Sequence, residues 1–111
     1  MGPILTAEHR EIETALERIS AENLDIEAFR HAHSLCERHY RREEVFLARL
    51  PAQLAAKLRA QHAEALEIAD RLAESLGAGQ TADAIYLVRR FLAIVQHNII
   101  EEERDVFPLF P

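Results

Sequence analysis

Histidine and glutamate residues recur in this sequence at a spacing that suits metal binding. Glu43 follows His39 by four residues, and Glu101 follows His97 by the same step. Residues four apart on a helix lie on one face, so each imidazole points the same way as its carboxylate. Imidazole nitrogens suit iron, copper, nickel and zinc, while carboxylates can bridge two cations and offset their charge. The pattern therefore predicts a metal centre.

The neighbouring apolar residues direct these side chains toward the interior of a helical protein. They recur at steps of three and four, the period of a core-facing helix stripe, and His9 and His62 lie on similar stripes. A buried carboxylate is costly unless it is paired or bound to metal. Two histidines per ion and two bridging glutamates would leave positions for a bridging oxygen and a small exogenous ligand. The expected ligands of two metal ions are His9, His39, Glu43, His62, His97 and Glu101.

Capping and helix-breaking residues divide the chain into four expected helices. Short loops make neighbouring helices antiparallel, so we expect an all-α, up-down-up-down four-helix bundle with a single domain over residues 1–111. At the rise of a helix, the four histidines fall in one layer, ~16 to ~24 Å above the lower loops. The dividing residues are Thr6, the segment 21–25 with Asp25, Leu50 with Pro51, Gly77 with Gly79, Thr81, and Pro108.

Composition and charge exclude several classes of protein. A net charge of −6 argues against nucleic-acid binding, which basic clusters drive. A single cysteine cannot form an intramolecular disulfide, which favours a reducing compartment. The first residues lack a signal-peptide pattern, and no apolar run is long enough to span a membrane. We therefore expect a cytoplasmic protein without a membrane partner.

Four stretches of the sequence resemble the hemerythrin family in its broad HHE cation-binding form. They are His9, the segment HYRREE with His39 and Glu43, His62, and the segment HNIIEEERDVFP with His97 and Glu101. The resemblance covers the whole chain. It implies a non-haem di-iron centre with an oxo or hydroxo bridge, which binds O₂, NO or a related small ligand.

Two departures from the oxygen carriers of that family bear on function. The oxygen carriers have a second histidine one turn beyond the third-helix histidine, and this chain has Leu66 at that position. In their fourth helix an Asp follows the histidine by five residues. Here Glu101 follows His97 by four residues and Glu102 follows it by five. The ligand set is closest to the hemerythrin-like domain of iron–sulfur-cluster-repair di-iron proteins. We expect binding or sensing of O₂, NO or iron. The alternatives are an enzyme acting on peroxide or nitric oxide, an iron donor in cluster repair, and a plain structural bundle.

Residues around the expected ligands carry further expectations. Cys36 is read as a small buried filler, and Tyr40 as either a partner near Glu43 or a surface residue. Glu44 and Glu102 are expected to be solvated. The fourth helix also carries an apolar stripe about 150° from its His97 face, which predicts a homodimer contact. That stripe consists of Val88, Leu92, Val95 and Ile99.

Overall fold

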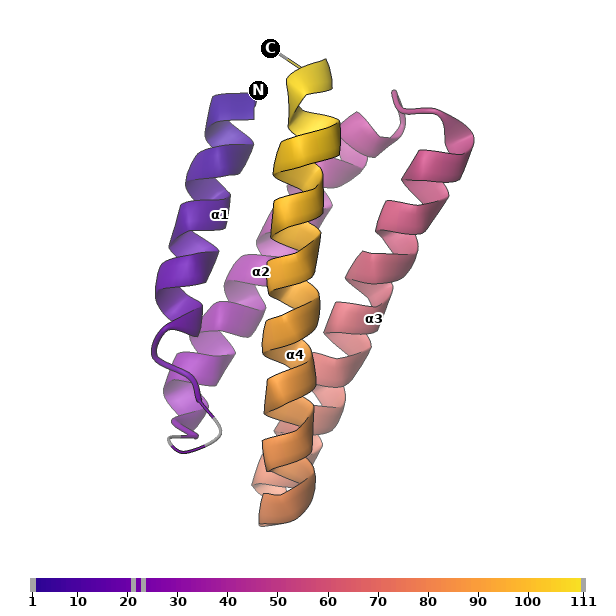
Figure 1. Cartoon of the computed structure of the whole chain (residues 1–111). Helices are drawn as coiled ribbons and strands as arrows, with labels where there is room; N and C mark the ends of the chain where they lie inside the picture. Colours follow the sequence, from indigo (N-terminus) through magenta and orange to yellow (C-terminus); the bar gives the residue numbers. More distant parts are fainter. Residues whose placement is uncertain (1, 21, 23, 111) are drawn as a thin grey trace.

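The computed structural model describes residues 2–20, 22 and 24–110, and this part of the chain is almost entirely helical. Consecutive helices lie side by side and run in opposite directions (Figure 1), which confirms the expected all-α four-helix bundle. The described helices include none that is long and apolar enough to cross a bilayer. The elements are α1 (Gly2–Leu16), α2 (Ile26–Leu47), α3 (Ala52–Gly77), α4 (Thr81–Glu101), a π-helical turn (Glu102–Val106) and a 3₁₀ turn (Phe107–Leu109).

Local chemistry explains most of the helix ends. The Asp25 side chain accepts hydrogen bonds from the backbone N–H groups of Glu27 and Ala28, at 3.0 and 3.3 Å, which confirms it as the cap of α2. Gly79 has a φ of 72°, a left-handed conformation that glycine adopts without strain, in the turn after α3. Other expected helix ends differ. Thr6 lies inside α1, which begins at Gly2, and Thr81 is the first residue of α4 and not its cap. Pro108 lies in the 3₁₀ turn, after α4 has ended at Glu101.

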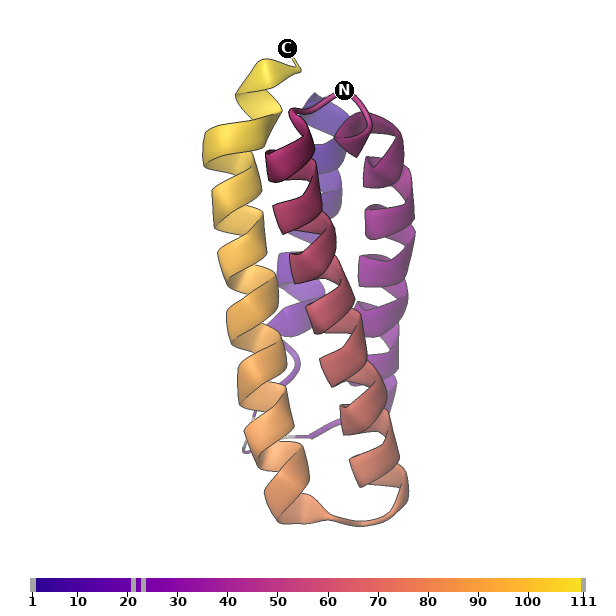
Figure 2. The same cartoon turned by 90° about the vertical axis from the view of Figure 1, so that its right-hand side faces the viewer.

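The apolar core has two parts. The larger cluster includes Phe29, Leu72 and Phe91 and fills the half of the bundle nearer the α1–α2 and α3–α4 loops. The smaller cluster includes Leu58 and Phe107 and fills the end where the two termini and the α2–α3 connection meet (Figure 2). Buried histidines and carboxylates occupy the level between the two clusters.

The inward face of α4 differs from the expected one. Val88, Val95 and Ile99 are at most 3% exposed and belong to the core, and Leu92 packs against it. The His97 side chain, in contrast, is 72% exposed. The stripe that suggested a homodimer contact is therefore buried in its own bundle, and the homodimer stays a prediction without that support.

Candidate metal centre

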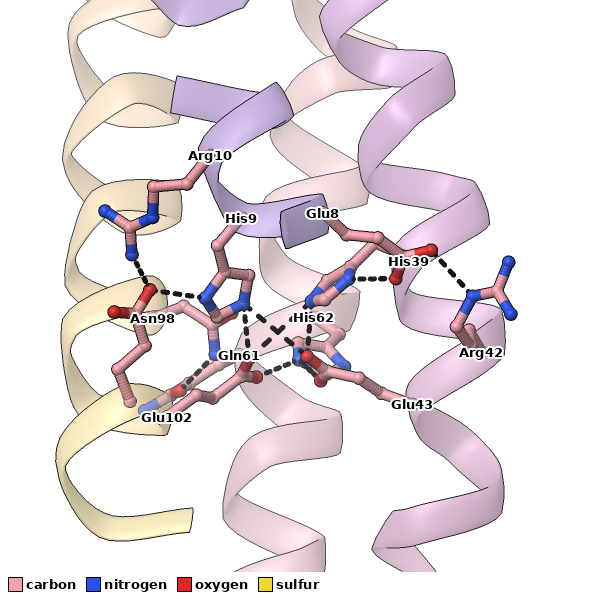
Figure 3. Close-up of polar contacts among 11 residues, drawn as sticks. Glu8, His9, Arg10, His39, Arg42, Glu43, Gln61, His62, Asn98 and Glu102 are labelled. Carbon is pink, nitrogen blue, oxygen red and sulfur yellow. Dashed lines mark hydrogen bonds and ion pairs between the residues drawn. The ribbon is translucent and has the colours of Figure 1, made fainter. Parts of the chain in front are cut away.

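Four buried side chains from three parts of the bundle converge on one point. His9 comes from α1, His39 and Glu43 from successive turns of α2, and Glu102 from the start of the π-helical turn that follows α4 (Figure 3). One nitrogen or oxygen atom from each lies within 4.8 Å of the others. All four residues are at most 3% exposed. Two imidazoles and two carboxylates so close together, away from water, form a donor set that can hold a metal ion.

His62 of α3 extends this group on the far side of the two carboxylates. Its Nε2 atom lies 2.8 Å from Glu102 Oε2 and 3.3 Å from Glu43 Oε2. The other oxygens face the opposite way, because Glu102 Oε1 is 3.0 Å from His9 Nε2 and Glu43 Oε1 is in close contact with His39 Nε2. Each carboxylate thus presents one oxygen to the His9 and His39 pair and the other to His62, which is how carboxylates between two cations are arranged.

Among the described residues, two buried polar atoms at the centre lack hydrogen-bond partners, and a third, the Tyr40 hydroxyl, lies beside it. His39 Nε2 and Glu43 Oε1 are enclosed and lie against each other. A ring nitrogen and a carboxylate oxygen in this position are costly unless a proton or a cation satisfies them. The residues present therefore fit a bound metal, which would take both atoms as ligands.

Outer carboxylates fix the orientation of two of the imidazoles. His39 Nδ1 lies 2.8 Å from Glu8 Oε1, and the other oxygen of Glu8 accepts a hydrogen bond of 2.6 Å from Arg42 Nε. His9 Nδ1 lies 2.9 Å from Glu103 Oε2. An ionised carboxylate can only accept, so in both pairs Nδ1 carries the hydrogen. The Nε2 atoms are then the ones left for metal, as in carboxylate–histidine–metal arrangements.

The electrostatics of the centre favour bound cations. Burial opposes protonation of the histidines, but the carboxylates of Glu102 and Glu43 outweigh it and raise the pKa of His9 to about 9, of His39 to about 10 and of His62 to about 8. Burial also opposes ionisation of Glu102, yet its contacts with the three imidazoles hold its pKa far below the ordinary range. Without metal, the three imidazoles hold protons at pH 7, and a metal must displace them.

The structure brings together four of the six residues expected as ligands, namely His9, His39, Glu43 and His62. His97 and Glu101 lie outside the centre. His97 Nε2 is 3.2 Å from Glu101. Glu101 also accepts a hydrogen bond of 3.0 Å from Gln61 Nε2 and forms an ion pair with Lys57. The expectation that Glu102 is solvated is wrong, because it is 1% exposed and stands where Glu101 was expected.

The orientation of α4 about its own axis explains why Glu102 lies in the centre and Glu101 does not. The buried residues Val95, Asn98, Ile99 and Glu102 follow each other at steps of three, one and three, so His97 points away from the core. Asn98 Nδ2 donates a hydrogen bond of 2.9 Å to Gln61 Oε1 inside the α3–α4 seam. Glu102 lies one turn beyond the apolar stripe of the fourth helix, so that stripe is the sequence feature that could have predicted its burial.

Aromatic rings pack against the histidines. The Tyr40 ring stacks on the His62 ring with centroids 3.9 Å apart and planes 9° apart, and Phe107 stacks on His9 at 4.9 Å. Tyr40 is 7% exposed, so the expected alternative of a surface position is wrong, but among the described residues its hydroxyl makes no hydrogen bond to Glu43. Cys36 is fully buried, as expected, and burial raises the pKa of its thiol to about 12, so it is an unreactive filler.

Comparisons with known proteins place this geometry in a family context. The family model described as the hemerythrin HHE cation-binding domain matches residues 3–110, nearly the whole chain. Searches of curated proteins and of solved structures gave no match.

Proposed function

The chain belongs to the hemerythrin HHE cation-binding family, and from that premise we propose that it is a non-haem di-iron protein that binds or senses a small ligand such as O₂ or NO. The observation that carries the proposal is the division of the Glu43 and Glu102 oxygens between the His9 and His39 pair and His62. Imidazole with carboxylate is a donor set that suits iron. Bound iron would supply a redox-active Lewis acid to which a small ligand can attach.

Each residue of the centre would have its own role in holding the metal ions. His9 and His39 would hold one ion, His62 the other, and Glu43 and Glu102 would lie between the two. Glu8 and Glu103 keep the two imidazoles turned inward. The apolar clusters above and below the level exclude water, which strengthens electrostatic interactions at the centre.

His97 and Glu101 are not among the proposed ligands. The sequence predicts both as ligands, and a centre that used them would need this end of α4 to rotate by about 100°, one residue step of a helix. Such a rotation would remove Asn98 and Glu102 from the interior, where both are at most 1% exposed. We therefore propose Glu102 as the second bridging carboxylate and leave His97 at the surface.

Matched glutamate variants test this assignment. Iron-loaded wild-type protein should contain about two iron ions per chain, the number that two bridging carboxylates serve. Glu102→Gln should lose at least one of them, whereas Glu101→Gln, one residue away, should keep both. Iron content after gel filtration and the ultraviolet–visible spectrum are the measurements. Loss of iron in Glu101→Gln with retention in Glu102→Gln would show that α4 turns in the loaded protein and that the assignment is wrong.

A further inference from the structure

The surface between α2 and α3 carries an open groove of about 590 Å³ that reaches the metal centre. His62 and Tyr40 line it, with Ala63 and Leu66 beside them. The His62 side chain is 8% exposed, while His9 is fully buried and His39 is 2% exposed. Of the three histidines at the centre, His62 is therefore the one with a face on this groove.

The inner wall of the groove is mostly apolar. The Tyr40 ring lies parallel to the His62 ring and covers one of its faces. Leu66 follows His62 by one turn of α3, so it lies on the same helix face and adds apolar surface where a further ligand side chain would otherwise stand. A wall of this kind favours small molecules of low polarity over hydrated ions.

Four charged residues line the groove, and their charges balance, because Glu37 and Glu44 are acidic and Arg41 and Arg59 are basic. Arg59 Nε lies 2.6 Å from Glu44 Oε1, and this pair joins α3 to α2 beside the groove. Both side chains are about half exposed, at 46% and 54%, so water screens their attraction and the pair can open. The rim therefore neither attracts anions strongly nor closes the groove permanently.

In the described part of the chain, the opposite side of the centre offers no comparable approach through its histidines. Phe107 stacks on His9, and Glu8 and Glu103 occupy the outer nitrogens of His39 and His9. A ligand arriving there would have to displace a packed ring or a hydrogen-bonded carboxylate.

We propose that the α2–α3 groove is the access route and binding site for a small uncharged ligand of two or three atoms, which reaches the centre on its His62 side. The metal-bound part of this inference rests on the function proposed above. The geometric part concerns only the contact between the groove and His62.

The geometric part is tested on metal-free protein. A neutral nitroxide added to the solution should broaden the ring proton signals of His62 more than those of His9 and His39 in NMR spectra. Ala63→Trp should suppress this broadening, because Ala63 is an exposed residue of the groove. Ala73→Trp, an exposed alanine further along α3 and outside the groove lining, is the matched control and should change nothing. Equal broadening of all three histidines would overturn the inference.

The ligand part is tested by stopped-flow binding of nitric oxide to the diferrous protein. Ala63→Trp should slow association and dissociation alike, each about tenfold, or ~1.4 kcal/mol of barrier, with the Kd within about twofold of wild type. Ala73→Trp should match the wild type. Arg59→Ala, which opens the rim pair, should raise both rate constants and provides a second variant if Ala63→Trp does not fold.

These outcomes separate the two proposals. If two irons bind but Ala63→Trp has the rates of Ala73→Trp, the groove is not the route and the function proposed above still stands. If no iron binds, that function fails, while the nitroxide experiment still decides whether the groove leads to His62.

Discussion

Replacing Glu8 by Gln tests how far a residue outside the proposed ligand set controls metal binding at the candidate centre. Glu8 Oε1 accepts the Nδ1 hydrogen of His39 at 2.8 Å. The amide keeps the size and one acceptor oxygen but removes the charge that makes the imidazole a better donor. Loss of such a partner typically costs 10- to 100-fold in metal affinity, or ~1.4 to ~2.7 kcal/mol. Glu8 is 14% exposed and shares its charge with Arg42, so we expect the lower end, about tenfold.

The assay is a competition titration of metal-free protein with Co²⁺ against a chelator of known affinity. Glu11→Gln is the control, because Glu11 lies on the same helix, 60% exposed and 3.7 Å from Arg38. Glu8→Ala, which also loses the acceptor, should weaken binding more than Glu8→Gln. Equal affinities of Glu8→Gln and Glu11→Gln would refute the reasoning, because the Glu8 carboxylate would then contribute nothing through His39.

Two further predictions concern pH and the exposed histidine. The raised pKa values of His9, His39 and His62 mean that their stabilising contribution is complete below about pH 6.5 and is lost as the pH rises through about 8 to about 10. Metal-free protein should therefore melt roughly 10 °C lower at pH 10 than at pH 6.5. Circular dichroism would detect this change in Tm. An unchanged Tm would mean that the histidines are already neutral at pH 6.5. His97→Ala should leave the iron content unchanged, because its side chain is 72% exposed; loss of one iron ion would identify His97 as a ligand in the loaded protein.

The sequence predicted the bundle because its hydrophobic period, its capping residues and its turn residues all indicate the same fold. Polar and apolar residues alternate with a helical period, and Asp25 and Gly79 stand where a cap and a left-handed turn are needed. The buried positions of His9, His39, Glu43 and His62 agree with the sequence for the same reason, since each lies on an apolar stripe of its helix.

The fourth helix was harder to orient because it carries apolar residues on two faces. Leu87 and Ile94 share a face with His97, which predicts that this face points inward, whereas the stripe with Val88 and Val95 predicts a homodimer contact. Packing decides between such faces. Val88, Val95 and also Leu87 are buried in the core, whereas Ile94 is only partly buried and the His97 side chain is exposed. The outer carboxylates could not be predicted either. Glu8 and Glu103 lie on polar positions beside the ligands, and only the placement of neighbouring helices shows that they reach the histidines.

Diffraction at the iron absorption edge from iron-loaded crystals tests the central claim most directly. We expect two anomalous peaks at the level between the apolar clusters, one beside His9 and His39 and one beside His62, with the carboxylates of Glu43 and Glu102 between them. A single peak, or peaks whose carboxylate ligand is Glu101 instead of Glu102, would contradict the account.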